Sequence, residues 1–298
     1  MKFFLYLFAF FVLTASGQPQ QKREHITVDG IKRDFVIYIP ALNNNDKLPV
    51  IISLHGRLGT GEGMMSFADF RPIADREKFI IVCPDGINRS WNDGRATPSE
   101  RKGIDDVHFI DQLITYLINT YNSDAKRVYV TGMSNGGFMS SRLACELTNR
   151  IAAVAVVGAS MDNDMGYHPT KPIPIMYIQG TKDPLVPYTG GELKKGAGGE
   201  IYSHAEVLKL WAETDGCNKT PVITNLADNA GDGTSIIKEE YVNTSTGVKV
   251  TGFTVSNGGH TWPGGTQYMA KFIVGVVSHN LNACEEIWKF FKGYSLEK

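Results

Sequence analysis

Two patterns of apolar and polar positions alternate along most of the chain. Continuous apolar runs rich in β-branched residues are typical of strands buried on both faces. Between them, stretches such as 104–121 have apolar positions spaced by three and four residues, as on one face of a helix. This alternation predicts a mostly parallel sheet with helices on both faces. The expected buried strands are 48–55, 79–86, 127–133, 151–159, 173–180 and 248–255.

The two ends of the pattern differ from this core. Near the start, 25–29 and 32–39 read as a hairpin that turns at Asp29-Gly30. Before it, Lys2 precedes an unbroken apolar run over 3–13, and small residues follow up to Gly17. A charged start, a short apolar core and small residues predict a signal peptide over 1–17. The run is too short for a bilayer span, which needs about 20 residues.

We therefore expect a secreted protein, extracellular or periplasmic, whose mature domain is 18–298 and which has no membrane partner after cleavage. No repeat or low-complexity linker divides this region, so it reads as one domain. The formal net charge is −1 and no basic block is present, which argues against a nucleic-acid partner. The sequence has no CxxC pair and no His/Cys cluster, so neither a metal nor a cofactor is expected.

The four cysteines fall into two groups. Cys83 and Cys145 lie in apolar segments, and each is expected to be a small buried core residue. Cys217 and Cys284 lie in more polar surroundings near the ends of helix-like segments. Because a secreted chain meets an oxidising environment, a Cys217–Cys284 disulfide is expected.

The motif Gly132-x-Ser134-x-Gly136 is the first candidate for chemistry. It is weak alone, because a chain with 31 glycines can contain it by chance. Its context is more specific, since the strand-like 127–133 precedes the serine and a helix-like stretch follows it. A sharp turn from strand to helix needs small residues on both sides and lifts the serine hydroxyl to the helix N-terminus. Ser134 is therefore the expected nucleophile.

A serine hydroxyl needs a histidine to take its proton and an acid to orient that histidine. His260 lies in a glycine-rich loop just after the strand 248–255, where parallel sheets place their functional loops. It is the expected base. The other histidines after Ser134 are weaker candidates: His168 precedes a strand, and His204 and His279 are expected at the surface.

The acid is expected after the strand 173–180. Asp183 lies three residues past Gly180, in a turn-like segment. Asp162 and Asp164 follow the preceding strand and are the rival acids, although a solvated turn fits them better. We expect Asp183 to orient His260.

Acyl transfer also needs N–H donors for the tetrahedral oxyanion. The backbone N–H of Asn135, directly after the nucleophile, is one expected donor. The second should come from the loop after the strand 48–55, where the N–H of Arg57 is the first choice and that of Leu58 the alternative. His55 is expected to brace this loop rather than to react.

Two tryptophans and two aspartates need weighing. Trp91 follows the strand 79–86, and Trp262 is two residues from His260. Both are candidates for substrate binding at the walls of an acyl pocket, and packing of the loops is the equal alternative.

Asp105 and Asp106 begin a helix-like stretch and are expected to cap its N-terminus rather than to bind a metal.

Seven blocks of the sequence, in order, resemble the secreted polyhydroxybutyrate-depolymerase/feruloyl-esterase group, which overlaps carbohydrate esterase family 1. The resemblance runs from about residue 30 to the C-terminus and implies an α/β-hydrolase fold with metal-free ester hydrolysis through an acyl-enzyme. It implies the same nucleophile, acid and base: Ser134, Asp183 and His260. Arg57 is a departure, because the group often has cysteine or an aromatic residue there. The blocks are VCPDG, SWN, DDVHFIDQLI, RVYVTGMSNGGFMSSRLACEL, IAAVAVVGAS, GTKDPLVPY and GGHTWPGG.

The leading functional hypothesis is a serine carboxylic-ester hydrolase acting on plant cell-wall esters, feruloylated or acetylated polysaccharide. Depolymerisation of short-chain polyhydroxyalkanoate is the alternative within the same chemistry. Such depolymerases usually carry a linker and an adsorption domain, and the pattern indicates neither here. A non-catalytic binding protein on the same fold and a serine peptidase are the remaining hypotheses.

Overall fold

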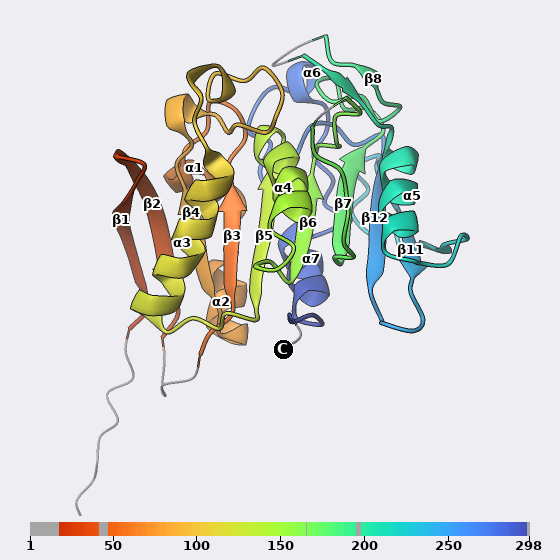
Figure 1. The fold of residues 1–298 in the computed structure, drawn as a ribbon. Coiled ribbons are helices and arrows are strands. Elements are labelled where there is room, and N and C mark those ends of the chain that lie inside the picture. The colour runs from red at the N-terminus through yellow and green to blue at the C-terminus, as the bar shows by residue number, and fades with distance from the viewer. Residues whose placement is uncertain (1–17, 42–46, 165, 195–197, 297–298) are drawn as a thin grey trace, which may run out of the picture.

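The structure, a computed structural model, describes residues 18–41, 47–164, 166–194 and 198–296. The expected signal peptide at 1–17 lies outside the described residues. The centre of the molecule is a ten-stranded sheet (Figure 1). In the order in which they lie side by side, its strands are β1 (Gln20–Val28), β2 (Ile31–Ile39), β4 (Ile80–Pro84), β3 (Val50–Leu54), β5 (Val128–Met133), β6 (Ala153–Val157), β7 (Ile175–Gly180), β12 (Lys249–Ser256), β11 (Ser235–Val242) and β10 (Val222–Asn225).

The sheet is parallel in its middle and antiparallel at both edges. Neighbouring strands from β4 to β12 pair in parallel. The β1–β2 hairpin, which turns at Asp29-Gly30 as expected, and the β10–β11 ribbon add antiparallel edges. The parallel strands are buried along their whole length except for the two ends of β12, which explains their near-continuous apolar sequences.

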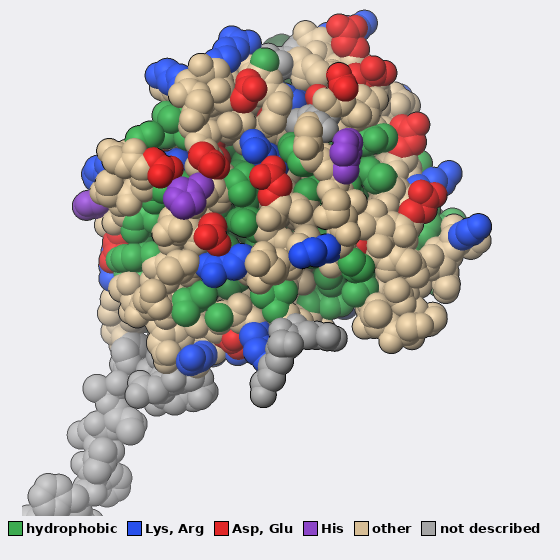
Figure 2. All heavy atoms as spheres, in the orientation of Figure 1, with side chains coloured by type: hydrophobic (Ala, Val, Ile, Leu, Met, Phe, Trp, Pro, Cys, Tyr) green, Lys and Arg blue, Asp and Glu red, His purple; other side chains and the backbone are tan. Residues whose placement is uncertain are grey.

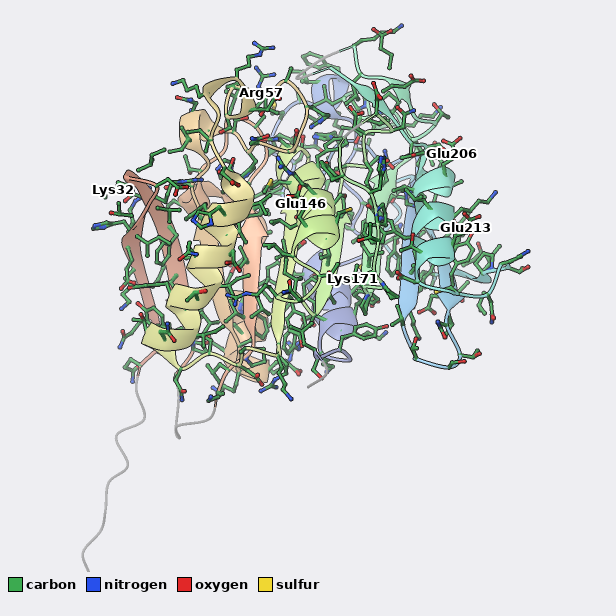
Figure 3. All side chains as sticks on the ribbon, viewed as in Figure 1. Lys32, Arg57, Glu146, Lys171, Glu206 and Glu213 are labelled. Carbon is green, nitrogen blue, oxygen red and sulfur yellow. The ribbon has the colours of Figure 1, made fainter. Side chains whose placement is uncertain are left out.

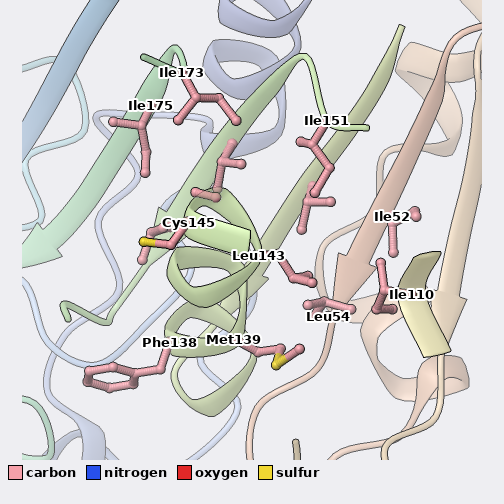
Figure 4. Packing of buried hydrophobic residues seen from close by; sticks show 14 of the residues in the cluster. Ile52, Leu54, Ile110, Phe138, Met139, Leu143, Cys145, Ile151, Ile173 and Ile175 are labelled. Atoms are coloured by element: carbon pink, nitrogen blue, oxygen red, sulfur yellow. The ribbon is translucent and has the colours of Figure 1, made fainter. Parts of the chain in front are cut away.

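Helices cover both faces of this sheet. One face packs against α3, α4 and α5, and the other against α1, α2 and α7. Figure 4 shows α4 on the first face, where Leu143 lies over Leu54 of β3. The helices are α1 (Gly61–Phe67), α2 (Arg71–Glu77), α3 (Asp106–Tyr121), α4 (Asn135–Glu146), α5 (His204–Thr214), α6 (Lys271–Val274) and α7 (Ala283–Phe291), with the 3₁₀ turns η1 (Ile87–Arg89) and η2 (Glu100–Lys102) and the short β8 (Gly191–Glu192) and β9 (Glu200–Ile201).

Parallel strands all end at one edge of a sheet, so the loops that follow them gather there. In Figure 1 this is the upper edge, above β3, β5, β7 and β12. Over the face shown in Figure 2, acidic and basic side chains are interspersed. None of the helices in the described part of the chain combines the length and the apolar character needed to cross a lipid bilayer.

The expected Cys217–Cys284 disulfide is wrong: both thiols are free. The sheet lies between them, because Cys217 packs with the cluster on the α5 face and Cys284 belongs to α7 on the opposite face. The sequence could not show that the two cysteines are separated, because segments of similar polarity at helix ends lie on opposite faces of the sheet. Cys83 and Cys145 are buried, as expected.

The two aspartates before α3 have separate structural roles. Asp105 caps the helix by accepting the N–H of His108 at 2.9 Å. Asp106 is fully buried, and its carboxylate pairs with Arg33 at 2.5 Å and accepts the N–H of Asn92 at 2.6 Å. Asp106 thus fixes the loop that follows β4 to the start of α3.

Candidate active site

Ser134 is the single residue between β5 and α4. Its backbone lies in an unfavourable region, with φ 56° and ψ −123°, which costs on the order of 1–3 kcal/mol. Neighbouring glycines make the turn sterically feasible. A Cβ on Gly132 would lie 2.3 Å from the carbonyl oxygen of Gly136, and one on Gly136 would lie 2.3 Å from that of Leu54. The chain therefore turns as sharply as the sequence predicts.

Hydrogen bonds fix the backbone of the serine and leave its hydroxyl free. The Ser134 N–H donates to the carbonyl of Val157 at 2.9 Å, and the Ser134 carbonyl accepts the N–H of Phe138 at 2.9 Å. The hydroxyl has no partner among the described residues and faces a cavity of about 540 Å³. It stands at the positive end of the α4 dipole, where negative charge is stabilised.

His260 and Asp183 form a buried pair at the same edge of the sheet. His260 Nδ1 lies 2.7 Å from Asp183 Oδ2, and the two side chains are 3% and 0% exposed. The other oxygen, Oδ1, accepts the N–H groups of Leu185 and Val186, each at 2.8 Å. An ionised carboxylate only accepts, so Nδ1 carries the proton and Nε2 of the neutral ring is an acceptor.

Packing brings His260 close to the serine. Its N–H donates to the carbonyl of Val274 at 2.6 Å. A Cβ on Gly158 would lie 3.3 Å from His260 Nδ1, so the ring packs against this glycine after β6. His260 and Ser134 line the same cavity, without a direct hydrogen bond between their side chains in the described structure. Catalytic hydrogen bonds often tighten only when substrate is bound.

The rival acids lie elsewhere. Asp162 Oδ1 accepts the N–H of Asp164 at 2.9 Å, and both residues line a separate polar hollow of about 630 Å³ together with Glu200. In the described structure neither carboxylate contacts a histidine. Of the carboxylates weighed from the sequence, Asp183 is the one in contact with His260.

The other candidate histidines differ from each other. His168 and His279 are exposed, as expected for His279. The expectation of a surface position for His204 is wrong. Its ring is fully buried and stacks on Tyr188 at 5.0 Å, and neither ring nitrogen has a partner in the part of the chain that the structure describes. The side chain at the start of α5 faces β12 instead of solvent, since a Cβ on Gly252 would lie 3.2 Å from His204 Nε2.

Burial of His204 makes the fold sensitive to acid. Loss of hydration lowers the pKa of His204 from 6.5 to about 4, so below pH 6.5 the unfolded chain binds a proton that the folded chain cannot. Its contribution is fully present above pH 6.5 and is lost as the pH falls towards 4, by about 3 kcal/mol in all. We expect His204→Phe to flatten this loss in urea unfolding curves between pH 7.5 and 5. His279→Phe, at an exposed position, is the control. If the free energy of unfolding fell equally steeply with decreasing pH in His204→Phe and in the native chain, the prediction would be wrong.

The first expected oxyanion donor is at the start of α4. Asn135 is the first residue of the helix, so its N–H has no intrahelical acceptor. Its side chain is tied to the loop after β4: Oδ1 accepts the N–H of Trp91 at 2.8 Å, and Nδ2 donates to Asp93 Oδ2 at 2.7 Å. Asn135 lines the cavity beside Ser134, and this clamp holds the helix start in position.

The structure distinguishes between the two candidates for the second donor. The N–H of Leu58 already donates to the carbonyl of Arg89 at 2.8 Å. The N–H of Arg57 has no acceptor among the described residues. A Cβ on the preceding Gly56 would lie 3.5 Å from Ser134 Cβ, so this loop runs directly past the serine. Arg57 lies at the upper edge of the sheet, where its side chain is exposed (Figure 3).

His55 braces this loop, as the sequence predicts. Its Nδ1 donates to the carbonyl of Gly56 at 2.8 Å, and its Nε2 accepts the N–H of Gly86 at 3.0 Å. Burial lowers the pKa of His55 and keeps the ring neutral. Both ring nitrogens are used, so the ring holds the loops after β3 and β4 together.

The structure does not place Trp91 and Trp262 at the walls of the cavity, where the sequence made them candidates for substrate binding. Trp91 is 0% exposed and donates from Nε1 to the carbonyl of His55 at 2.9 Å, and Trp262 is 1% exposed and packs edge-on against Phe67 and Phe70. Neither ring lines the cavity. Both rings fill the space beneath loops, which is the alternative that the sequence left open.

The cavity above Ser134 is mostly apolar. Its wall holds two arginines, of which the exposed Arg57 was singled out from the sequence and Arg95 was not. The segment around Arg95 has no apolar period and reads as an irregular loop, so no signal in the sequence marked it. The apolar lining residues are Leu58, Met64, Phe67, Met133, Phe138, Leu185, Val186, Leu193, Tyr268 and Met269.

No model of a known protein family matches the chain. Among curated proteins, NocK of Nocardia uniformis subsp. tsuyamanensis, described by name as an esterase, is 29% identical over 255 residues, which are 82% of this chain and 74% of NocK. Feruloyl esterase B of Piromyces equi is 28% identical over 239 residues, which are 76% of this chain and 42% of that protein. Among solved structures, an acetyl xylan esterase from Aspergillus awamori has a TM-score of 0.60 at 16% identity and covers 91% of this chain and 99% of its own.

The comparisons confirm two expectations. The fold is that of the α/β-hydrolases, and the class of enzyme is carboxylic-ester hydrolase. The chain spans less than half the length of the feruloyl esterase that it resembles.

Proposed function

We propose that this chain hydrolyses esters through a covalent acyl-enzyme, with Ser134 as nucleophile, His260 as base and Asp183 as the acid that orients it. The observation that carries the proposal is the joint position of these residues. A free hydroxyl on a strained turn and a buried histidine–carboxylate pair border one cavity. A binding protein would have no need of such a strained serine.

The geometry supports a two-step reaction. Ser134 Oγ attacks the ester carbonyl carbon while His260 Nε2 takes its proton, and the oxyanion that forms accepts the N–H groups of Asn135 and Arg57. As the tetrahedral intermediate collapses, the alcohol leaves with the proton from Nε2 and the acyl group stays on the serine. Water then attacks the acyl-enzyme with the same base, which releases the acid and restores the hydroxyl.

In the proposed reaction, the buried carboxylate of Asp183 has two tasks. It fixes the tautomer in which Nε2 accepts, and it stabilises the positive charge of the imidazolium that forms. The N–H groups of Leu185 and Val186 hold it in place. No group beyond these side chains and backbone amides is needed for the steps described.

We further propose plant cell-wall esters as substrates. The names of relatives, which include feruloyl and acetylxylan esterases, support an acyl group carried on polysaccharide. The cavity of about 540 Å³ lies within the range of roughly 300–1,000 Å³ found for sites of drug-sized ligands. An acetyl group would fill little of it, so the volume and the apolar walls favour an aromatic acyl group. The relatives named above give no comparable support to polyhydroxyalkanoate.

A secreted location suits such a substrate, because polysaccharide is outside the cell. We propose that 1–17 is a signal peptide and that the mature chain begins near residue 18. N-terminal sequencing of the exported protein would show the cleavage point.

Covalent labelling tests the proposed nucleophile directly. A fluorophosphonate ester should phosphonylate one serine, because only an activated hydroxyl reacts quickly. We expect peptide mapping to find the adduct on Ser134 and methyl ferulate to slow its formation. Labelling of Ser140 or Ser141, which lie in α4 just after Ser134, would contradict the proposal. So would the absence of any labelling in a folded chain.

A further inference from the structure

A buried ion pair lies in the cavity wall beside Ser134. Arg95 is 8% exposed, and its Nη2 lies 2.5 Å from Asp93 Oδ2. The guanidinium stacks on the ring of Phe138, with its central carbon 3.5 Å from the ring centroid. An arginine held on two sides in this way keeps one orientation, so its remaining N–H groups point in fixed directions.

The pair leaves donors unused at the cavity. Arg95 Nε and Nη2 both donate to Asp93, whereas Nη1 has no partner among the described residues. Thr97 is buried beside it, and its Oγ1 accepts the N–H of Glu100 at 3.2 Å but has no acceptor for its own hydrogen in the described structure. Arg95 and Thr97 both line the cavity. A ligand that fills the cavity removes water from these donors, and a donor left without a partner is costly, so this wall is suited to a ligand that brings an acceptor.

The negative charge of Asp93 indicates which kind of acceptor fits beside Arg95. Asp93 already neutralises the guanidinium, and it also accepts Asn135 Nδ2 at 2.7 Å. A second anion would be repelled by this carboxylate and would lose its hydration on entering an apolar cavity. A neutral oxygen, such as a phenol hydroxyl or a methoxyl, needs only the donors.

Exposure differs among the residues that line the cavity. Arg95 and Thr97 are 8% and 2% exposed, whereas Leu58, Tyr268 and Met269 are 65%, 41% and 45% exposed. A polysaccharide must extend into solvent, so it leaves past the exposed residues, and the terminal acyl group can contact the buried ones.

We propose that Arg95 and Thr97 form an acyl-recognition site that selects aromatic acyl groups carrying a neutral oxygen on the ring, remote from the ester. This inference rests on the proposed function and narrows its substrate class. Acetyl and unsubstituted aromatic acyl groups lack the acceptor, so they leave both donors unpaired.

Binding to an inactive chain separates recognition from catalysis. With Ser134→Ala as background, calorimetry should find methyl ferulate bound about tenfold more tightly than methyl cinnamate, since a hydrogen bond to a charged donor contributes at least this much. Adding Thr97→Val, which keeps the shape and removes the hydroxyl, should reduce the ratio severalfold. Adding Arg95→Met should bring it close to one.

A matched control and two outcomes decide the inference. Arg101 is exposed, and its side chain has no partner among the described residues, so Arg101→Met should keep the ferulate preference. Equal binding of the two esters in the Ser134→Ala background overturns the inference, and so does an equal loss for both esters in Arg95→Met and Thr97→Val. The proposed function is judged separately, by whether the native chain hydrolyses p-nitrophenyl acetate and methyl cinnamate.

Discussion

Replacing Ser134 with alanine should lower kcat for ester hydrolysis by about 10⁴–10⁶ and leave the fold intact. The hydroxyl has no partner in the described structure, so removing it breaks no hydrogen bond. Serine and alanine also pay nearly the same cost for φ 56°. The free energy of unfolding should therefore change by less than about 1 kcal/mol. Steady-state kinetics with p-nitrophenyl acetate and urea unfolding measure the two effects.

Ser134→Gly is the sharper companion variant. It removes the same hydroxyl, but glycine adopts a positive φ without strain, so it should be more stable than Ser134→Ala by about 1 kcal/mol. Both variants should be equally inactive. Turnover by either folded variant close to that of the native chain would exclude Ser134 as the nucleophile.

Asp183→Asn should lower kcat by about 10⁴ while the protein stays folded. Leu185 and Val186 donate two N–H groups to Oδ1, so the amide oxygen of an asparagine will stay there. Its NH₂ group must then face His260 Nδ1, which becomes an acceptor and moves the ring proton to Nε2. A protonated Nε2 cannot take the proton of Ser134, so the loss comes from a wrong tautomer rather than from a lost contact.

Asp162→Asn is the matched control, because Asp162 was the rival acid and lies in the separate polar hollow. It should retain esterase activity within a fewfold of the native chain. A crippled Asp162→Asn beside a nearly silent Asp183→Asn would transfer the role of the acid to Asp162.

Elements with strong periodicity could be predicted from the sequence. The buried strands and the turn at Ser134 are local consequences of apolar runs and of glycines that nothing larger can replace. The order of candidates along the chain also pointed to Asp183 and His260, because loops after parallel strands meet at one edge of the sheet. Distances between these loops decide which side chains touch, and those distances exist only after the sheet has formed.

The errors share one physical cause: polarity is local, but burial depends on the whole fold. His204 begins a helix among polar neighbours and yet packs against β12. Trp91 lies in an irregular loop that folds inward, because its indole donates to His55. Arg95 reads as a loop cation, but Asp93 and Phe138 enclose it at the cavity wall. No pattern in the sequence records which loop covers another.

The strand order has a consequence for when activity appears during synthesis. The base follows β12, which is inserted between β7 and β11, and β11 precedes it in the chain. The candidate nucleophile at 134 and acid at 183 are thus made long before the base at 260. The pairing of β12 with β7 in the middle of the sheet cannot form until β12 itself has been made. Because such distant pairings form slowly, a nascent chain has no complete site until most of it has been made. Until its last third has been folded into place, the chain would be harmless to the esters of the cell that makes it.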